Sequence, residues 1–343
     1  MMRLLHGLVL ATVTATVACQ KQEGEESELC ASSPPTMTVN ARPLKLSSTL
    51  LHKNSAGKYK HILAKPLSSS MGAEVCWLDL SRPMEDAQLV ELKDALHRHG
   101  MIFIRNQNLT YADQERLTMG LGEYATDAYT AGVPGHPHVA RIVKEADTIA
   151  RTVFGEGWHT DSPFLRQPPA YSILYSKQVP PYGGDTMFSS SRLAYKYLSE
   201  TMKGMLRGLR VRMSAARVLA VINAVGNGKL GDSKLSMQQK TMLQGNLHPL
   251  VRLHPVTGEP SLYVDHTYAV HIDGLTTTES DALLGFLRAH VVQETLTCRL
   301  RWEDNMVAIW DNRLVVHRAF NDYNGFRREH YRTLVEGEEP IMF

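Results

Sequence analysis

The chain lacks any strong imbalance of charge. It has 37 lysine and arginine residues against 35 aspartate and glutamate residues, a formal net charge of +2, and neither sign gathers in a long block. Binding to nucleic acid or to an anionic membrane surface relies on concentrated positive charge. We therefore expect neither partner and predict a small-molecule ligand. Internal repeats and low-complexity tracts are also absent, and whether copies of the chain form a homo-oligomer stays open.

Cysteine is scarce, with four residues in the whole chain. Removal of a leader at Ala18 would keep all four, with Cys19 as a lipidation candidate and an odd number left over. The count therefore does not decide between an oxidising and a reducing compartment. Cys76 and Cys298 lie in strand-like runs, and we predict that both are buried as apolar residues.

The N-terminus has no hydrophobic run long enough to span a bilayer comfortably. Arg3 precedes a mostly apolar run over 4–18 and then a polar stretch, which is typical of a secretory signal. Thr16-Val17-Ala18-Cys19 also loosely resembles a bacterial lipoprotein cleavage site. We predict that residues 1–30 are a signal or leader segment. An organelle-targeting peptide and a non-functional leader are the alternatives.

The chain after this leader divides by composition. Residues 31–58 are rich in Ser, Thr, Pro and Lys with few aromatic residues, which predicts a linker or disordered arm. With 43% hydrophobic residues overall, the remainder can bury a full core, and we predict one domain over 59–340.

Short strand-like runs dominate that domain. They predict a mainly β fold with flanking helices, of the α+β class. Strands are expected over 61–64, 73–78, 101–104, 140–143, 171–175, 251–253, 262–264, 298–302 and 306–310, with another from Thr186; helices are expected over 85–99, 110–122 and 191–209, with another from Thr276. Residues 124–138 are predicted to form a loop. Residues 213–246 have no strand signal and are predicted to be a mobile lid or a surface insertion.

The stretch Gly157-Trp158-His159-Thr160-Asp161 carries the first chemical signal. A His and an Asp two apart on an extended segment project to the same side and can share a metal ion. The best candidate for a third ligand is the distant His317. Two histidines and one carboxylate leave three faces of an octahedral ion open, the geometry of non-haem Fe(II) oxygenases. The alternative is a histidine at the surface or in a cap.

Two longer runs resemble the taurine dioxygenase family of Fe(II)- and 2-oxoglutarate-dependent enzymes, the TauD/TfdA family. The first, from Trp158 to Phe188, contains Pro168-Pro169, Val179-Pro180-Pro181 and Gly183-Gly184-Asp185-Thr186; the second starts at Trp310-Asp311-Asn312-Arg313 and keeps His317, Arg328 and Arg332 at the family's spacing. The resemblance covers residues 59–340. It implies a double-stranded β-helix, the jelly roll of cupin-like proteins, with helices outside.

The resemblance also implies a role for each residue that matches the family's motifs. Fe(II) would be bound by His159, Asp161 and His317, with 2-oxoglutarate and O₂ on the remaining faces. Arg328 would bind the far carboxylate of 2-oxoglutarate, since a guanidinium matches a carboxylate as a planar fork, and the hydroxyl of Thr186 would assist. Decarboxylation to succinate and CO₂ would accompany hydroxylation of the substrate.

Substrate contacts follow from the same resemblance. Arg332 would bind an anionic group, so the substrate would carry a carboxylate, sulfonate or sulfate ester, and Tyr268 would line the pocket. Taurine enzymes place a sulfonate-binding His where this chain has Asp127, and a substrate-contacting Tyr where it has Thr130, with Tyr129 adjacent. A carboxylate repels a sulfonate, so we expect taurine to be a poor substrate. Asp127 would either point into solvent or bind a cationic group of the substrate.

Three alternatives follow from these residues. Asp161 argues against a halogenase, because relatives that halogenate replace this carboxylate with a small residue. A Zn²⁺ hydrolase could use the same His₂Asp set, but Arg328 and Thr186 argue against it, because a hydrolase needs no dicarboxylate site. A catalytically silent binding protein of the same fold is the third. Fe(II) and 2-oxoglutarate are most available in reducing compartments, which favours the cytoplasm, while the leader leaves export, anchoring or organelle targeting open.

Overall fold

The computed structural model describes residues 52–148, 155–225 and 237–343. The predicted leader and most of the predicted arm lie outside these residues, and residues 52–58 contain no helix or strand. The helices are α1 (Asp86–His99), α2 (Tyr111–Leu121), α3 (Ser191–Lys196), α4 (Glu200–Leu206), α5 (Ala216–Val225), α6 (Met237–Gln244) and α7 (Thr277–Val291). Within the described ranges, no helix is both long enough and apolar enough to cross a bilayer.

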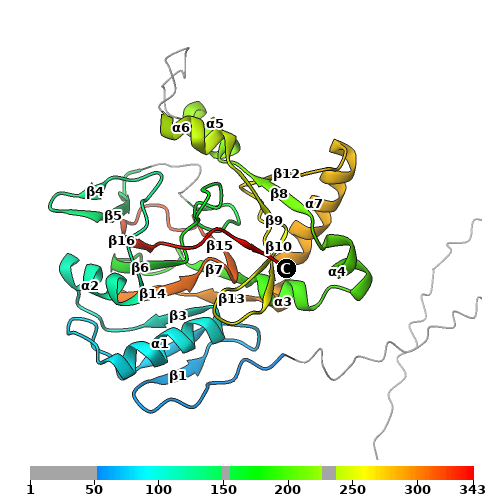
Figure 1. Cartoon of the computed structure of the whole chain (residues 1–343). Helices are drawn as coiled ribbons and strands as arrows, with labels where there is room; N and C mark the ends of the chain where they lie inside the picture. The colour runs from blue at the N-terminus through cyan, green and yellow to red at the C-terminus, as the bar shows by residue number, and fades with distance from the viewer. Residues whose placement is uncertain (1–51, 149–154, 226–236) are drawn as a thin grey trace, which may run out of the picture. The chain divides into compact units, whose positions relative to one another are not determined.

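The largest sheet has eight strands in the order β1-β2-β3-β14-β6-β16-β5-β4 (Figure 1). A second sheet has the order β13-β7-β15, and two further three-stranded sheets have the orders β12-β8-β9 and β11-β10-β17. The strands are β1 (Leu63–Pro66), β2 (Ala73–Cys76), β3 (Met101–Ile104), β4 (Gly132–Val133), β5 (His136–Lys144), β6 (Tyr171–Gln178), β7 (Thr186–Ser190), β8 (Arg210–Met213), β9 (Asn246–Pro249), β10 (Val251–Leu253), β11 (Pro260–Leu262), β12 (Ala269–Ile272), β13 (Thr297–Leu300), β14 (Met306–Asp311), β15 (Val315–Ala319), β16 (Arg328–Val335) and β17 (Ile341–Met342). Pairing is antiparallel except between β2 and β3.

Strand β3 and residues 306–310 of β14 are apolar at every position because both of their faces are covered. On β14, Val307 and Ile309 join one core cluster while Met306, Ala308 and Trp310 join another. Successive side chains on a strand point to opposite faces, so the two clusters lie on the two sides of the large sheet. Burial on both sides explains why this strand has no polar alternation.

Helices α1 and α2 cover one side of the large sheet, as Figure 1 shows. Leu92 and Leu96 of α1 and Leu117 and Leu121 of α2 belong to the same cluster as Val307. The helix boundaries have local causes. Gly100 ends α1 in the left-handed region at φ 72°, which glycine adopts without steric cost. Thr110 and Asp113 form a capping box at the start of α2, in which each side chain accepts from the other residue's backbone N–H.

The sheet β13-β7-β15 covers the opposite side. Phe188 of β7, Leu300 of β13 and Val315 of β15 share a core cluster with Phe103 and Trp310 of the large sheet. Two facing sheets with helices on the outer surface form the predicted double-stranded β-helix, and the α+β class is confirmed. The residues implied as a metal and co-substrate site project into the space between the two sheets.

Several predicted elements differ in detail. The expected helix over 191–209 is two helices, and Ser199 caps the second by accepting a hydrogen bond from the Met202 N–H. The predicted loop 124–138 already contains β4 and the start of β5. The segment 213–246 includes α5 and α6, while 226–236 lie outside the described residues. Cys298 is buried as predicted, but Cys76 is partly exposed.

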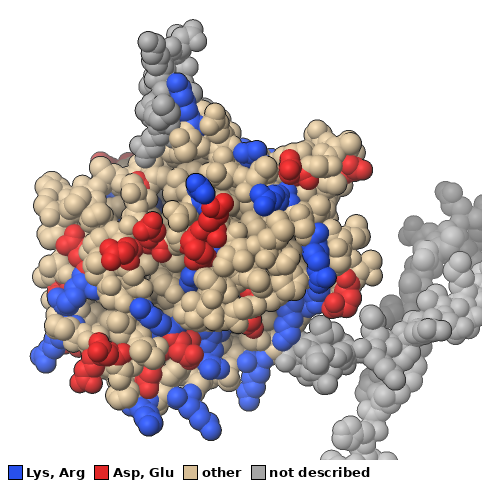
Figure 2. Space-filling view, in the orientation of Figure 1, with Lys and Arg blue, Asp and Glu red and all other residues tan. Residues whose placement is uncertain are grey.

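The surface repeats the charge balance of the sequence. On the face drawn in Figure 2, basic and acidic side chains are interspersed among uncharged ones.

Candidate metal and co-substrate site

The backbone brings His159 and His317 side by side. The two residues form an isolated antiparallel bridge, with the His159 N–H donating to the His317 carbonyl at 2.9 Å and the reverse bond at 2.7 Å. His317 lies on β15, whereas residues 157–161 form no strand beyond this bridge. The prediction of an extended strand carrying His159 and Asp161 is therefore wrong in that detail, because the chain turns at Ser162, which has a φ of 45°.

Three ligand atoms converge in this interior. Nε2 of His159 lies 3.7 Å and Nε2 of His317 4.0 Å from Oδ1 of Asp161, and the three atoms lie within 4.8 Å of one another. These separations exceed hydrogen-bonding distance, so no shared proton holds the three together. Nδ1 of His159 donates to the Gly157 carbonyl at 2.7 Å, which leaves its Nε2 as a lone-pair donor. Two imidazole nitrogens and one carboxylate oxygen fit Fe(II).

Asp161 is oriented by two residues that the sequence analysis did not assign. The hydroxyl of Ser172 on β6 donates to Oδ2 of Asp161. Asn312 donates to Ser172 at 2.9 Å through Nδ2 and accepts from the Asp161 N–H at 3.3 Å through Oδ1. Oδ1 of Asp161 therefore faces the histidines. The Trp-Asp-Asn-Arg run contains Asn312, but no spacing rule connects it to Ser172.

Electrostatics keep these groups in the protonation states that a metal needs. Burial alone would raise the pKa of Asp161, but Arg332, the two imidazoles and Ser172 together hold it below its usual value. Burial, with a smaller contribution from His159, lowers the pKa of His317 to about 3. At neutral pH the pair is thus a carboxylate and a neutral imidazole.

Arg328 is a buried cation on β16. Burial lowers the pKa of Arg328 to about 10, so the group stays protonated at neutral pH. Its Nε donates to the Gly184 carbonyl at 3.2 Å. Its guanidinium carbon lies 5.9 Å from the ring centroid of Trp302 and 5.9 Å from that of Tyr323. No carboxylate among the described residues is hydrogen-bonded to this guanidinium, so its Nη groups fit an external carboxylate.

Thr186 lines the same cavity as Arg328, Arg332 and the two histidines. Its hydroxyl oxygen accepts a hydrogen bond from the Trp302 indole at 2.9 Å. Since a hydroxyl can accept and donate at once, its own hydrogen can point to a ligand carboxylate on Arg328. Trp310 also lines this cavity, with its ring 4.8 Å from that of His317.

Arg332 lies four residues beyond Arg328 on β16, and both line the cavity as predicted. Its Nη2 donates to Oδ2 of Asp127 at 2.6 Å, its Nε to the same oxygen at 3.2 Å, and its Nη1 to Oδ1 of Asp161 at 3.4 Å. Asp127 is therefore paired within the protein. It does not point into solvent, and its partner is a cation of the protein itself.

Tyr268 is buried near the metal ligands, with its ring 6.3 Å from that of His159. Its hydroxyl accepts from the Tyr129 hydroxyl at 3.0 Å, so Tyr129 rather than Thr130 reaches this region. Asp265 anchors the backbone here, accepting from the N–H groups of Tyr268 at 2.6 Å and Thr160 at 3.3 Å. No motif in the sequence points to Asp265.

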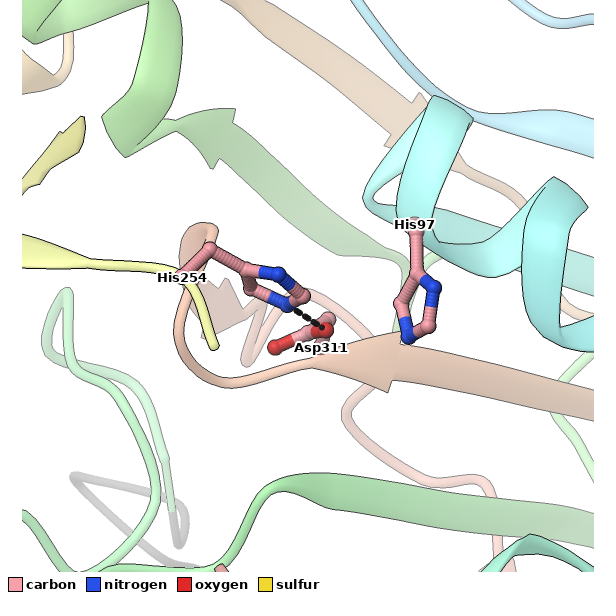
Figure 3. Close-up of side chains that lie close together, drawn as sticks. All are labelled: His97, His254 and Asp311. Carbon is pink, nitrogen blue, oxygen red and sulfur yellow. Dashed lines mark hydrogen bonds and ion pairs between the residues drawn. The ribbon is translucent and has the colours of Figure 1, made fainter. Parts of the chain in front are cut away.

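A second buried cluster has the same composition: His97, His254 and Asp311 (Figure 3). Nε2 of His254 donates to Oδ2 of Asp311 at 2.9 Å. The guanidinium of Arg313 donates to both carboxylate oxygens, at 2.8 Å from Nε and 2.7 Å from Nη2. Because a cation already occupies the carboxylate, this cluster is an ion-paired network and not a second metal site.

Comparison with known proteins agrees with this geometry. Residues 63–334 match the family described as "Taurine catabolism dioxygenase TauD, TfdA family". The chain is 32% identical over 280 residues to an alpha-ketoglutarate-dependent sulfate ester dioxygenase of Pseudomonas putida, covering 80% of this chain and 90% of that protein. It is 30% identical over 308 residues to an alpha-ketoglutarate-dependent sulfonate dioxygenase of Saccharomyces cerevisiae, covering 86% and 71%.

A solved structure shares the fold. The crystal structure of a taurine dioxygenase from Burkholderia xenovorans superimposes with a TM-score of 0.70 at 34% identity, covering 82% of this chain and 92% of that chain. Together with the buried His₂Asp triad, these matches show that the chain belongs to the TauD/TfdA family of 2-oxoglutarate-dependent dioxygenases, in which Fe(II) is the typical metal.

Proposed function

We propose that the enzyme hydroxylates a small organic acid, a sulfonate, sulfate ester or carboxylate, with 2-oxoglutarate and O₂ as co-substrates and succinate and CO₂ as co-products. The observation that carries this proposal is the pair of buried arginines on one strand. Arg328 and Arg332 line a single cavity with the His₂Asp triad, so one can bind the co-substrate and the other the substrate. The relatives from P. putida and S. cerevisiae are named for sulfate esters and sulfonates.

In this proposal His159, Asp161 and His317 hold Fe(II), which when bound supplies the oxidising chemistry with O₂ and 2-oxoglutarate. Ser172 and Asn312 fix the rotamer of Asp161, so that one oxygen faces the metal. The carbonyl of Gly157 fixes the tautomer of His159. Such outer contacts preserve the ligand geometry and so the metal affinity.

The co-substrate would be bound by charge and shape. Arg328 offers its guanidinium fork to the far carboxylate of 2-oxoglutarate, and Thr186 offers a hydroxyl donor beside it. A buried charge-assisted pair of this kind is strong because water does not compete with it. The substrate would place a C–H bond near the metal, and a hydroxyl introduced beside a heteroatom would lead to cleavage to an aldehyde.

The Zn²⁺ hydrolase and the silent binding protein are weaker proposals for this site. A hydrolase would need no buried cation for a dicarboxylate, whereas Arg328 is a buried cation that contacts the Gly184 carbonyl and two rings, which supports a co-substrate role. Membership of a dioxygenase family supports a dioxygenase over both the hydrolase and the binding protein.

The test is turnover of purified protein loaded with Fe(II). Succinate would be measured with 2-oxoglutarate and a panel of alkyl sulfonates, alkyl sulfates, aryloxy acids and amino acids. We expect at least one of the acids to raise succinate formation above the substrate-free rate, with its own loss in one-to-one ratio. Arg332→Gln should lose that stimulation yet keep slow substrate-free decay of 2-oxoglutarate. Stimulation by none of the acids would contradict the proposed substrate class.

A further inference from the structure

The loop that carries Asp127 is tied to the strand that carries Arg332. Tyr124 forms an antiparallel bridge with Val335, and the Ala125 N–H donates to the Leu334 carbonyl at 2.9 Å. Two residues further along the loop and two residues back along β16, the side chains of Asp127 and Arg332 meet. The ion pair is therefore built into the backbone arrangement and does not depend on chance contact between two flexible side chains.

Asp127 is itself held in place. Its Oδ1 accepts from the N–H groups of Tyr129 at 2.9 Å and Thr130 at 3.0 Å, an Asx turn that fixes the carboxylate. Its Oδ2 accepts from two nitrogens of Arg332. The two side chains are only 11% and 6% exposed. A desolvated, hydrogen-bonded pair of this kind is costly to open.

The two side chains of the ion pair line different cavities. Arg332 lines the cavity that holds the metal ligands, Thr186 and Arg328. Asp127 lines a neighbouring cavity of about 430 Å³, whose walls include Ala125, Ala128, Ala131, Pro137 and Ala140. The first cavity is cationic in its charged lining and also has apolar walls such as Leu174 and Trp310, while the second mixes small apolar side chains with the polar Thr126, Thr130 and His138.

Charge balance shows what the pair does to a substrate. Fe(II) and 2-oxoglutarate offset each other, and Asp161 and Asp127 offset Arg328 and Arg332. The centre is then neutral before any substrate binds, and an anionic head group would make it negative. With an uncharged residue in place of Asp127, the centre would be cationic and would accept an anion without excess charge.

We propose that Asp127 is a specificity-determining residue that competes with the substrate's anionic group for Arg332, and that the substrate is an organic acid whose apolar body extends into the cavity beside Asp127. This inference rests on the proposed function, because it assumes that Arg332 is the anion site. Every acid binds more weakly because its anionic group must first displace Asp127 from Arg332. An apolar body recovers affinity, since each buried methylene contributes roughly fourfold to binding. Compact acids such as taurine have no such body.

The experiment compares matched ligands on two proteins. Ethanesulfonate, hexanesulfonate and the uncharged hexanesulfonamide would be titrated by calorimetry into the anaerobic Fe(II)–2-oxoglutarate complex of the parent and of Asp127→Asn. Asparagine can keep the Asx turn but presents an amide without charge. We expect the parent to bind hexanesulfonate at least about tenfold more tightly than ethanesulfonate. In the variant, Kd for both sulfonates should fall at least about tenfold, equivalent to ~1.4 kcal/mol, with Kd for the sulfonamide unchanged.

Asp281→Asn on α7 is the matched control, because it removes one exposed negative charge elsewhere in the chain. It should leave all three affinities as in the parent. Where an acid is also oxidised, the gain in Asp127→Asn should be a lower KM rather than a higher kcat. A sulfonate affinity that is unchanged or weaker in Asp127→Asn, or an equal gain for the sulfonamide, would overturn the inference. So would equal binding of the two sulfonates by the parent.

Failure of the proposed function gives a different result. If neither protein oxidises any acid but Asp127→Asn binds sulfonates more tightly, Asp127 competes for Arg332 as inferred and the proposed substrate class is wrong. If the parent oxidises an acid and Asp127→Asn shows no gain in affinity, the proposed function stands and the role of Asp127 is wrong.

Discussion

The two His/His/Asp clusters contain the same residue types, and both are buried. They differ in what neutralises the carboxylate. Asp311 is paired with Arg313 through both of its oxygens and accepts a hydrogen bond from His254. Asp161 keeps one oxygen facing two imidazole nitrogens at 3.7 and 4.0 Å. A buried carboxylate needs a cation. Asp311 has one in its two-oxygen pair with Arg313, whereas Asp161 has a single 3.4 Å contact with Arg332 and leaves room between it and the two histidines for a metal.

The pKa of Asp311 reflects its close pairing with Arg313. Burial alone would raise the pKa of Asp311, but Arg313 and His254 lower it far below its usual value. The fold therefore supplies the charge partner of Asp311 permanently. Composition and spacing identify a potential metal site, but the hydrogen bonds already made by the ligand atoms decide whether it can bind one.

The largest effect should come from removing a metal ligand. His159→Ala, Asp161→Ala and His317→Ala should each abolish stoichiometric Fe(II) binding, because each removes one of three protein ligands. His97→Ala and His254→Ala are the matched controls and should keep full iron content. Iron per chain after anaerobic loading and desalting measures this, with the thermal midpoint as a check of folding. Full iron content in any of the first three variants would remove that residue from the set.

Breaking the cluster of His97, His254 and Asp311 should destabilise the fold without changing the iron content. Arg313→Met leaves Asp311 buried without its cation, which costs on the order of 3–5 kcal/mol. The free energy of unfolding from urea titration should fall by that amount, while iron stoichiometry stays that of the parent. The double variant Arg313→Met, Asp311→Asn should recover part of the loss. If the single variant were as stable as the parent, the comparison between the clusters would be wrong.

The next prediction concerns Arg328, a buried arginine whose proposed partner is the carboxylate of a bound ligand. Arg328→Gln should raise the KM for 2-oxoglutarate steeply, by the roughly 2–5 kcal/mol lost when one side of a buried charge pair is removed. Unlike Arg313→Met, it should leave the free energy of unfolding of the ligand-free protein nearly unchanged, because no carboxylate of the described chain depends on it. Arg332→Gln is the contrast, and a similar KM increase there would show that the two arginines do not divide their roles as proposed.

The smallest effect concerns the hydroxyl that orients Asp161. Ser172→Ala should weaken Fe(II) affinity by about 10- to 100-fold, the usual range for a lost contact behind a ligand. Ser176→Ala, on the same strand but bonded to the Glu303 and Met306 carbonyls, should not. Competition with a chelator of known affinity measures both, and equal behaviour of the two variants would indicate a general packing effect.

The sequence predicted the parts of the site that depend on spacing along the chain. The H-x-D pair and the interval from His317 to Arg332 pointed to residues that do meet in one cavity. It could not predict that Asp127 pairs with Arg332, because that contact depends on a loop docked to β16 through Tyr124 and Ala125. Ser172 and Asn312 were missed for the same reason, since a hydrogen bond between distant segments leaves no local pattern.

The fold shows a similar division. The apolar runs of β3 and β14 and the helix start at Thr276 are local signals, and each is confirmed. The helix predicted over 191–209 was too long because apolar periodicity continued through Leu198, while Ser199 starts a new helix by capping it. Strand β4 and the start of β5 were missed because β4 has only two residues and both stretches are partly exposed.

The bridge between His159 and His317 has a consequence for how the protein acquires its iron. About 160 residues separate the two ligands along the chain, yet their backbones are hydrogen-bonded to each other. Contacts between such distant segments form late, since the entropy of closing the intervening loop must be overcome first. As the chain leaves the ribosome, the complete ligand set cannot exist until β15 has emerged, long after His159 and Asp161. A metal ion held by all three residues must therefore bind after that stage of synthesis.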